Sequence, residues 1–388
     1  MSEKKLPKVL LYFDDISRVY ERTFLEGVTE YARTHGPWEF YGQIGNFSPA
    51  LPMIDPKEAD GIIVRVHDKE KIDSIATAKV PVITVPLAPL VSQKNIVMIT
   101  DNDAVGKMAA EYFLDRGFKN FAFLGYNNRE WSSDRKDGFA KALKAAGFDS
   151  VDVLETRCEL GVHFTLEEQA LIADWLKSLP KPAAVFTAND ERGLHVITTG
   201  KKADIKIPKE VSVLGVDDDI VYCGFCSPQL SSISKSCKKA GYETAEALDD
   251  LMNCREVKKK EIVVQPTHII SRGSTDTVVA EDYEVRHAYN YIKNNYDKAI
   301  QVSDIAKEVL ISRRSLERRY RRVMGRTIHD DIRNNRIEHI CHFLIEKDIS
   351  LKQIALSLGH SNVGNMSRYF KQVMGVSPRI YRRRYSIK

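Results

Sequence analysis

The spacing of hydrophobic positions changes along the chain. Over roughly residues 6–270, short runs rich in β-branched residues alternate with stretches in which apolar residues recur every three or four positions. The runs predict strands and the stretches predict helices. The predicted strands are Lys8–Phe13, Gly61–Val66, Pro81–Val85, Ile96–Thr100, Asn120–Gly125, Asp152–Glu155, Ala183–Thr187 and Val211–Val216. The predicted helices lie near Tyr20–Thr34, Ala104–Arg116, Arg135–Ala146, Leu166–Ser178, Glu191–Ala203 and Lys238–Met252.

Several predicted strands are apolar throughout, as in Gly61-Ile62-Ile63-Val64. Such runs are typical of strands that helices cover on both faces, which indicates doubly wound parallel α/β sheets. The length of this region accommodates two such lobes. No strand is followed by a glycine-rich phosphate loop, which argues against a nucleotide-dependent enzyme.

Beyond about residue 283 the helical spacing continues and contains an internal repeat. Val302–Gly325 (repeat 1) corresponds to Ser350–Gly375 (repeat 2), since Tyr320 matches Phe370 and both copies end in Val-Met-Gly. Each copy predicts two amphipathic helices around a tight turn, which is a helix-turn-helix. A long helix near Ile328–Glu346 is predicted to hold the two units about 34 Å apart, one turn of duplex DNA.

Charge separates the same two regions. Residues 283–388 contain 22 Lys and Arg against 10 Asp and Glu, whereas the rest of the chain contains 36 against 43. An acidic module is therefore joined to a strongly basic one, which indicates that the second module meets phosphate. The basic residues gather on the second helix of repeat 1, where Glu317 is the only acid among Arg313, Arg314, Arg318, Arg319, Arg321 and Arg322. Because a solvated helix face normally mixes signs, we interpret this face as a DNA-binding element.

The C-terminal segment resembles the AraC family of transcription regulators over about Tyr283–Arg384. The matching positions are Ile354, Ala355, Gly359, Phe370, Lys371, Gly375, Pro378, Tyr381 and Arg382, whereas His360 and Met366 stand where the family prefers Phe. The resemblance implies double-stranded DNA contacts from Ser312, Arg313, Arg314, Glu317, Arg318 and Arg322 in repeat 1, and from Asn362, Asn365, Arg368 and Lys371 in repeat 2. Arg314 and Arg318 suit guanine edges and Glu317 suits a cytosine amine. Val363 and Gly364 replace the polar readers of the family, so repeat 2 is expected to read bases weakly.

Residues 7–274 resemble the effector domain of LacI-type repressors, which is similar to periplasmic sugar-binding proteins. The resemblance rests on four stretches, which are residues 101–125, 131–148, 186–193 and 207–218. The expected fold is a two-lobed, doubly wound α/β domain of the periplasmic-binding-protein type (residues 1–274), a linker (275–282) and an all-α domain with two helix-turn-helix units (283–388).

This combination resembles bacterial regulators of pentose-utilisation operons. It implies a cytoplasmic activator that responds to D-xylose or a related monosaccharide, works with RNA polymerase and pairs as a homodimer through the N-terminal lobe. The apolar run near the start, Val9–Phe13, is too short for a secretory signal or a membrane span.

Candidate ligand residues follow from the chemistry of sugars. Hydroxyl groups need carboxylates, amides and guanidinium groups, and the C–H face of a sugar needs an aromatic ring. In open parallel sheets such groups lie beyond the C-terminal strand ends, in the crevice between lobes. Together with the resemblance, this rule selects Asp14, Tyr20, Arg22, Asp101, Trp131, Arg135, Asn189, Asp190 and Asp217.

Structural roles compete with several of these assignments. Asp101 and Asp190 are as well suited to capping the helices that follow them. Trp131 is suited to a loop core as well as to stacking on a sugar. Asp218 and Asp219 are expected to be solvated.

An enzymatic or redox function is the alternative from a different class. Carboxylate pairs such as Asp217-Asp218 suit acid–base chemistry, and Cys223-Gly-Phe-Cys226 is the one motif-like cysteine pair. The ten histidines are dispersed, and no nucleophile–base pair accompanies the carboxylates. We therefore expect no catalysis, no cofactor and no metal, and free thiols throughout.

Overall fold

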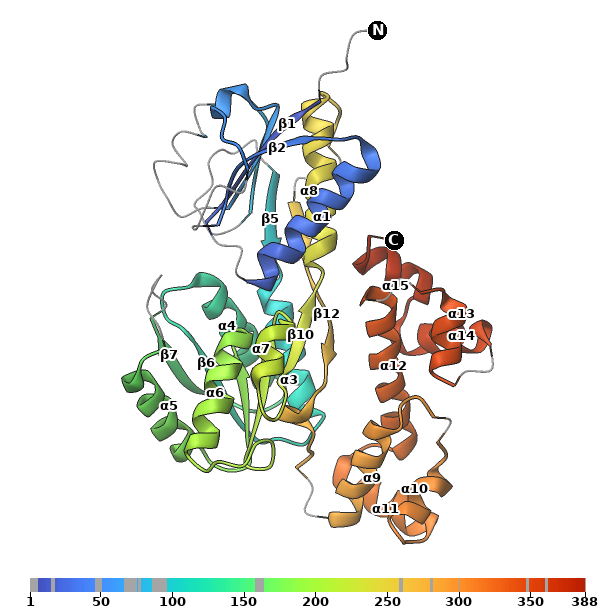
Figure 1. Cartoon of the computed structure of the whole chain (residues 1–388). Helices are drawn as coiled ribbons and strands as arrows, with labels where there is room; N and C mark the ends of the chain where they lie inside the picture. The colour runs from blue at the N-terminus through green and yellow to red at the C-terminus, as the bar shows by residue number, and fades with distance from the viewer. Residues whose placement is uncertain are drawn as a thin grey trace. The chain divides into compact units, whose positions relative to one another are not determined.

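The computed structural model describes residues 6–14, 18–45, 51–65, 75, 78–85, 96–157, 164–257, 261–279, 282–298, 300–346, 349–359 and 362–387. The chain divides into two compact bodies. The first body comprises Met1–Asp101 and Ser236–Gln265, and the second comprises Asn102–Lys235 and Pro266–Ser386. Each body is built around its own six-stranded sheet (Figure 1).

The sheet of the first body has the order β11-β5-β4-β3-β1-β2, and every neighbouring pair is parallel. Its strands are β1 (Lys8–Phe13), β2 (Glu39–Ile44), β3 (Gly61–Arg65), β4 (Val82–Thr84), β5 (Ile96–Thr100) and β11 (Glu261–Val264). The central strands are buried on both faces, as their continuous apolar runs predict.

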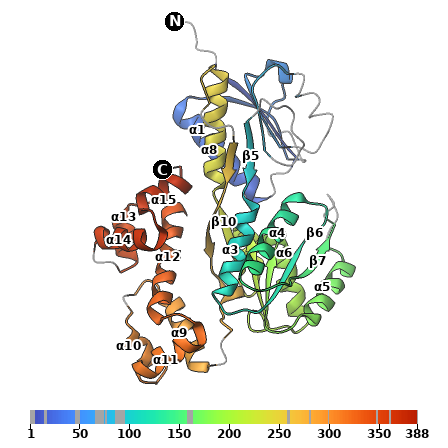
Figure 2. The same ribbon diagram turned by 180° about the vertical axis from the view of Figure 1, so that it is seen from behind.

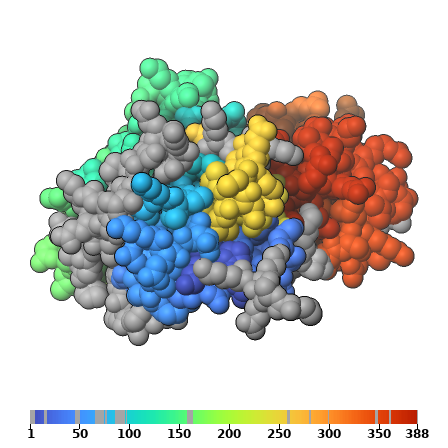
Figure 3. Space-filling model, turned by 90° about the horizontal axis from the view of Figure 1, so that it is seen from above, coloured from blue at the N-terminus to red at the C-terminus, as the bar shows by residue number. Residues whose placement is uncertain are grey.

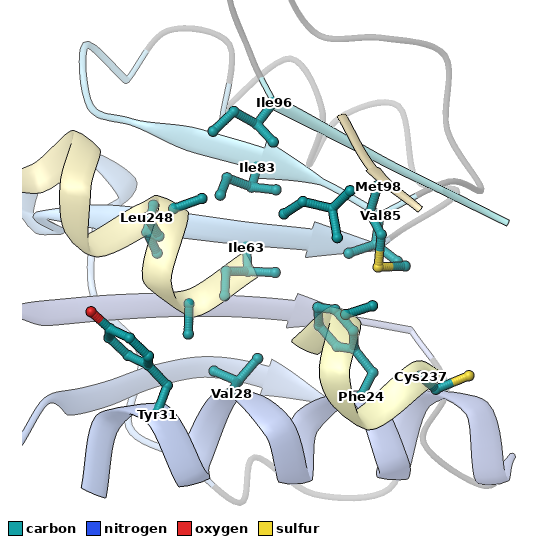
Figure 4. Packing of buried hydrophobic residues seen from close by; sticks show 14 of the residues in the cluster. Phe24, Val28, Tyr31, Ile63, Ile83, Val85, Ile96, Met98, Cys237 and Leu248 are labelled. Carbon is teal, nitrogen blue, oxygen red and sulfur yellow. The ribbon is translucent and has the colours of Figure 1, made fainter. Parts of the chain in front are cut away.

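One face of this sheet is covered by α1 (Val19–His35) and α8 (Cys237–Met252), whose apolar side chains converge on Ile63, Ile83 and Met98 (Figure 4). The two helices pack with their backbones in contact: a Cβ added at Gly27 or Gly241 would lie 1.9 Å from a carbonyl oxygen of the other helix. In Figure 3, α8 (yellow) lies beside N-terminal segments of the same body (blue).

The sheet of the second body has the order β12-β10-β9-β8-β6-β7, in which only β12 runs antiparallel to its neighbour. Its strands are β6 (Asn120–Tyr126), β7 (Asp152–Thr156), β8 (Ala183–Thr187), β9 (Val211–Val216), β10 (Ser231–Lys235) and β12 (Pro266–Ile270). Helices α3 (Asn102–Leu114) and α4 (Glu130–Ala145) pack on one face, and α5 (Leu166–Ser178) and α6 (Asp190–Lys202) on the other (Figure 2). A short helix, α7 (Ile220–Phe225), follows β9.

The C-terminal residues of the second body are helical. Repeat 1 contains α10 (Val302–Glu308) and α11 (Arg313–Met324), and repeat 2 contains α13 (Leu351–Ser357) and α14 (Val363–Met374). The long helix α12 (Ile328–Glu346) joins the repeats, with α9 (Tyr283–Asn294) before them and α15 (Pro378–Tyr385) after them. This arrangement confirms the predicted pair of helix-turn-helix units.

The sequence pattern missed α7 and four strands, namely β2, β10, β11 and β12. β2 is a sheet edge that is mostly only partly buried, so its sequence lacks the continuous apolar run of the central strands. β10 reads Ser-Ser-Ile-Ser-Lys and is nevertheless fully buried, since its hydroxyl groups bond within the fold. Hydrophobicity alone therefore does not reveal it.

Candidate functional site

Arg135 is the centre of a polar cluster in the second body. It lies in the second turn of α4 and is 4% exposed. Its Nε donates to Oδ1 of Asn102 at 3.0 Å, and its Nη1 donates to the carbonyl oxygen of Ala188. The guanidinium carbon lies 4.9 Å from the centre of the Trp131 ring. Arg135 is therefore an oriented donor beside an aromatic face, as a sugar site requires.

Asp217 lies beside this guanidinium, directly after β9. Its Oδ1 is 3.8 Å from Nη2 of Arg135 and 2.5 Å from Nζ of Lys235, which ends the neighbouring strand β10. Asp217 has a φ of 109°, a left-handed conformation that is strained for a residue with a side chain. The end of the sheet thus holds a carboxylate between two cations. Lys235 was missed because β10 was missed; the rule of C-terminal strand ends would otherwise have selected it.

Asn189 and Asp190 lie at the start of α6 in different roles. Asn189 is the helix cap, since its side-chain oxygen accepts the amide of Arg192 at 3.1 Å. Asp190 is 1% exposed, and its two oxygens accept from Ser232 Oγ at 2.6 Å and from the amide of Asp219 at 2.7 Å. Burial, followed by the nearby Asp217 carboxylate, raises the pKa of Asp190 well above its usual value. Asp190 therefore ties the loop after β9 to the start of β10.

Two neighbouring aspartates differ from the expectation that they are solvated. Asp219 is 4% exposed and caps α7 by accepting the amide of Val221 at 2.9 Å. Asp218 forms an ion pair of 2.6 Å with Arg272. Both predictions were wrong because they assigned the loop after β9 to solvent, whereas the short helix α7 folds it back onto the body.

Of the candidates in the first body, Asp14 and Asp101 follow β1 and β5, whereas Tyr20 and Arg22 lie on α1. Tyr20 is buried and its hydroxyl lies 3.3 Å from Thr100 Oγ1. Arg65 stacks over the Tyr20 ring at 4.6 Å and donates to Glu21 at 2.9 Å. Asp14 and Asp101 follow β1 and β5 and donate their amides to the carbonyl oxygens of Arg65 and Val264, while Arg22 is exposed. Strand ends therefore bring polar side chains together in this body as well.

In repeat 1, the candidate DNA-binding residues lie on α11, which starts at the cap Ser312. Arg314, Arg318, Arg321 and Arg322 are exposed. Arg313 and Glu317, one helical turn apart, form an ion pair of 2.9 Å. Arg319 points away from this surface: it donates to both oxygens of Asp282 and to Glu284 at 2.6 to 2.9 Å. One arginine of the six therefore stabilises the domain.

Repeat 2 presents a less charged helix. Asn362 caps α14 by accepting the amide of Asn365 at 2.8 Å, and Arg368 and Lys371 are exposed further along the helix. Gly364 is exposed and Val363 is partly buried. Two exposed cations on α14, against five exposed arginines on α11, give repeat 2 the smaller capacity for phosphate and base contacts.

The cysteine pair offers little for redox chemistry. Cys223 and Cys226 are both buried and free. Burial, the largest cause, raises the pKa of the Cys226 thiol to about 12 and raises that of Cys223 further. Since the thiolate is the reactive species, both side chains are inert at neutral pH. Among the residues that the structure describes, no group of three or more His, Cys, Asp or Glu is arranged to hold a metal ion. Within the same residues, no helix is long and apolar enough to cross a membrane.

Comparison with known proteins agrees with this geometry. Residues 110–275 match the periplasmic binding protein-like domain and residues 305–384 match a helix-turn-helix domain. The xylose operon regulatory protein of Haemophilus influenzae is 27% identical over 97% of this chain and 98% of its own. That of Escherichia coli K12 is 28% identical over 97% of each chain. A solved structure of the xylose-binding transcription activator xylR is 26% identical, with a TM-score of 0.61 over 99% of both chains. The predicted fold class, an α/β effector domain followed by a helical DNA-binding domain, is confirmed.

Proposed function

We propose that the chain, a sugar-responsive DNA-binding transcription regulator, responds to D-xylose and activates genes for xylose use. The observation that carries this proposal is the cluster of Arg135, Trp131 and Asp217 at one end of the second sheet, joined in one chain to two helix-turn-helix units. Full-length similarity to regulators named for the xylose operon supports D-xylose as the effector.

In this proposal the cluster binds sugar hydroxyls. Arg135 donates, Asp217 and Asn189 accept, and Trp131 stacks on the C–H face. Lys235 is a second donor beside Asp217. Asp190 does not bind the sugar in this proposal but stabilises the loop that carries Asp217. Within the first body, the proposed sugar-binding residues are Asp14, Tyr20, Arg22 and Asp101. An isolated charge in such a site would be costly, so the sugar exchanges hydrogen bonds with groups that are already paired and oriented.

The domain boundaries are part of the same proposal. Residues 1–274 form the effector domain, 275–282 the linker and 283–388 the DNA-binding domain of the AraC type. The active species is a cytoplasmic homodimer on a paired operator, because one chain contacts too little DNA for specificity in a genome. Activation then involves RNA polymerase, and the protein has no catalytic activity.

The test of the effector is ligand binding to the full chain. Calorimetry with D-xylose, L-arabinose, D-ribose and D-glucose is expected to rank D-xylose first. Arg135→Ala and Asp217→Ala are each expected to weaken binding by about 2 kcal/mol or more, which is about thirtyfold, because a buried partner is left unpaired. Lys144→Ala, an exposed position on the same helix α4, is the control and leaves binding unchanged.

Operator binding without sugar is the companion measurement. Both ligand-site variants are expected to retain it, since the basic surface of the DNA-binding domain is untouched. If another monosaccharide binds best, the architecture holds and the effector assignment is wrong. If Arg135→Ala and Asp217→Ala both bind D-xylose like the parent, the site lies elsewhere.

A further inference from the structure

Helix α3 connects the ligand cluster with the DNA-binding residues of the second body. Its first residue, Asn102, accepts the hydrogen bond from Nε of Arg135 at 3.0 Å. Just beyond its last residue, the carbonyl oxygen of Asp115 accepts from Arg326 of the helical region, and Glu338 of that region acts electrostatically on Arg116. A single rigid element of 13 residues therefore has the candidate sugar residue at one end and the DNA-binding domain at the other.

Helices α3 and α4 pack tightly enough to move together. A Cβ added at Gly106 of α3 would lie 2.4 Å from the backbone oxygen of Arg135 and from the amide of Phe139. A Cβ added at Gly138 of α4 would lie 2.6 Å from the backbone oxygen of Asp103. With backbone against backbone, a displacement of Arg135 is transmitted to α3 rather than absorbed between the helices.

The far end of α3 is bonded to repeat 1. The carbonyl oxygen of Asp115 accepts from Nη1 of Arg326, which directly follows Gly325, the C-cap of α11. Arg326 also donates to Asp331 Oδ1 at 2.7 Å, and the other oxygen of Asp331 accepts from the Tyr320 hydroxyl of α11 at 2.5 Å. The end of the arginine-rich helix is thus fixed to the end of α3 through one arginine.

Arg116 is the unusual residue of this junction. It is 3% exposed, and its Nη1 donates to the carbonyl oxygen of Tyr112 at 3.2 Å. Its Nε and Nη2 are buried without a hydrogen-bond partner among the described residues. Burying a guanidinium with unmet donors costs free energy. A second conformation of the junction, in which Arg116 gains an acceptor, is therefore close in free energy to the observed one.

Two groups of the DNA-binding domain act on this guanidinium electrostatically, namely Tyr289 and Glu338. Burial lowers the pKa of Arg116, but Tyr112, Tyr289 of α9 and Glu338 of α12 together raise it above its ordinary value, so the side chain stays charged. Glu338 itself is held by Lys293 at 2.7 Å. A shift of α3 that brought Arg116 to Glu338 would give this carboxylate a second cation and would satisfy one unmet donor of Arg116. Coupling between the two sites requires such a second arrangement of the junction.

We propose that Arg116 is the positioning residue that couples the sugar site to repeat 1, with α3 as the connecting element. The inference rests on the proposed function, since it assumes that the effector engages Arg135. A sugar that accepts hydrogen bonds from Arg135 weakens the bond between Arg135 and Asn102, and this shifts α3. Arg116 and the Asp115–Arg326 bond then set the orientation of α11 for DNA.

The test compares Arg116→Met, Arg116→Lys and the control Lys119→Met in the full chain. Lys119 lies three residues on and is exposed, so its loss removes the same charge without touching the junction. For each protein, D-xylose affinity is measured by calorimetry, and operator affinity is measured with and without D-xylose. The quantity compared is the coupling ratio, defined as the operator Kd without sugar divided by the operator Kd with sugar. In the parent this ratio is expected to differ from 1 by about 5- to 150-fold, in either direction.

For Arg116→Met this ratio is expected to fall to about 1, while D-xylose affinity stays within twofold of the parent by this argument. Arg116→Lys retains the charge, so its ratio should lie between 1 and the parent value. Lys119→Met should have the same ratio as the parent. The melting temperature of Arg116→Met should be equal to or above that of the parent, because an apolar side chain replaces a charge with unmet donors. That readout separates uncoupling from misfolding.

An undiminished ratio in Arg116→Met would overturn the inference. A parent chain that binds neither D-xylose nor DNA would overturn the proposed function instead, so the two failures are distinct.

Discussion

The two helix-turn-helix repeats have the same scaffold and different surfaces. The second helices, α11 and α14, each span 12 residues. Each starts at a polar cap, Ser312 or Asn362, and each ends at a glycine with φ near 70°, Gly325 or Gly375. Leu316 and Tyr320 of repeat 1 are fully buried, as are Met366 and Phe370 of repeat 2. Positions that form the core and the caps therefore keep their chemistry in both copies.

Exposed positions diverge. α11 carries five exposed arginines where α14 carries Arg368 and Lys371. Affinity for a duplex is set by phosphate neutralisation, and specificity is set by contacts to base edges. We therefore expect repeat 1 to read the base sequence and repeat 2 to bind mainly the phosphate backbone.

The largest expected effect is that of removing the candidate base readers of repeat 1. Arg314→Ala and Arg318→Ala are each expected to cost about 1 to 3 kcal/mol of specific binding, or about 5- to 150-fold. Both should reduce discrimination between the operator and a scrambled duplex, as measured by gel shift at fixed salt. Arg368→Ala in repeat 2 is the matched variant: binding weakens similarly for both duplexes and the salt slope falls by about 1. Equal loss of sequence preference from the two repeats would contradict this division.

Sequence reasoning recovered what hydrophobic spacing encodes. The bounds of β1, β5, β8 and β9 were predicted correctly because each strand is short and mostly apolar. Both helix-turn-helix units were predicted because the buried residues recur at helical spacing. Arg135 and Asp217 were selected by the rule of strand ends, and the structure places them 3.8 Å apart.

What the sequence did not reveal depends on partners distant in the chain. Lys235 became a candidate only once β10, a buried strand rich in serine, was seen beside β9. Arg319 resembles its five neighbours in sequence, and only the fold brings Asp282 to it from 37 residues away. The acceptor that a polar side chain finds is a property of tertiary structure, so spacing alone does not identify it.

A moderate effect is expected at Arg319, whose counterpart in repeat 2 is Tyr369. Arg319 binds Asp282 and Glu284 at the start of α9, whereas the Tyr369 hydroxyl donates to the carbonyl oxygen of Arg333 on α12 at 2.8 Å. Arg319→Ala is expected to lower the free energy of unfolding, because its charge-assisted bonds to two carboxylates are lost. Tyr369→Phe should cost about 1 kcal/mol. Urea unfolding measures both.

The pH dependence of stability distinguishes the two contacts. Burial tends to raise the pKa of Asp282, but its bonds from Arg319 and from the amide of Val285 outweigh this and lower the pKa. A carboxylate with a depressed pKa stabilises the fold fully above its unfolded value of about 3.9, and loses this contribution as the pH falls through its folded value. Titrating unfolding from pH 6 to pH 3 should therefore narrow the gap between the parent and Arg319→Ala, and leave the gap for Tyr369→Phe constant. A gap for Arg319→Ala that is independent of pH would exclude Asp282 as its source.

The smallest expected effect concerns the turn between the helices, where repeat 1 has Leu310 and repeat 2 has Gly359. Both residues are left-handed, with φ of 55° and 67°. For Leu this conformation costs about 1 to 2 kcal/mol, and Leu310 recovers little of it by burial because it is 89% exposed. Leu310→Gly removes the strain and adds the backbone entropy cost of glycine, so a net stabilisation of up to about 1 kcal/mol is expected in urea unfolding.

Leu310→Ala keeps the strain while removing the side chain, and its free energy of unfolding should be close to that of the parent. Gly359→Ala imports the strain into repeat 2 and should be destabilised by about 1 kcal/mol. If Leu310→Gly is no more stable than Leu310→Ala, the leucine side chain rather than its backbone determines the stability of this turn, and the two repeats are not equivalent there.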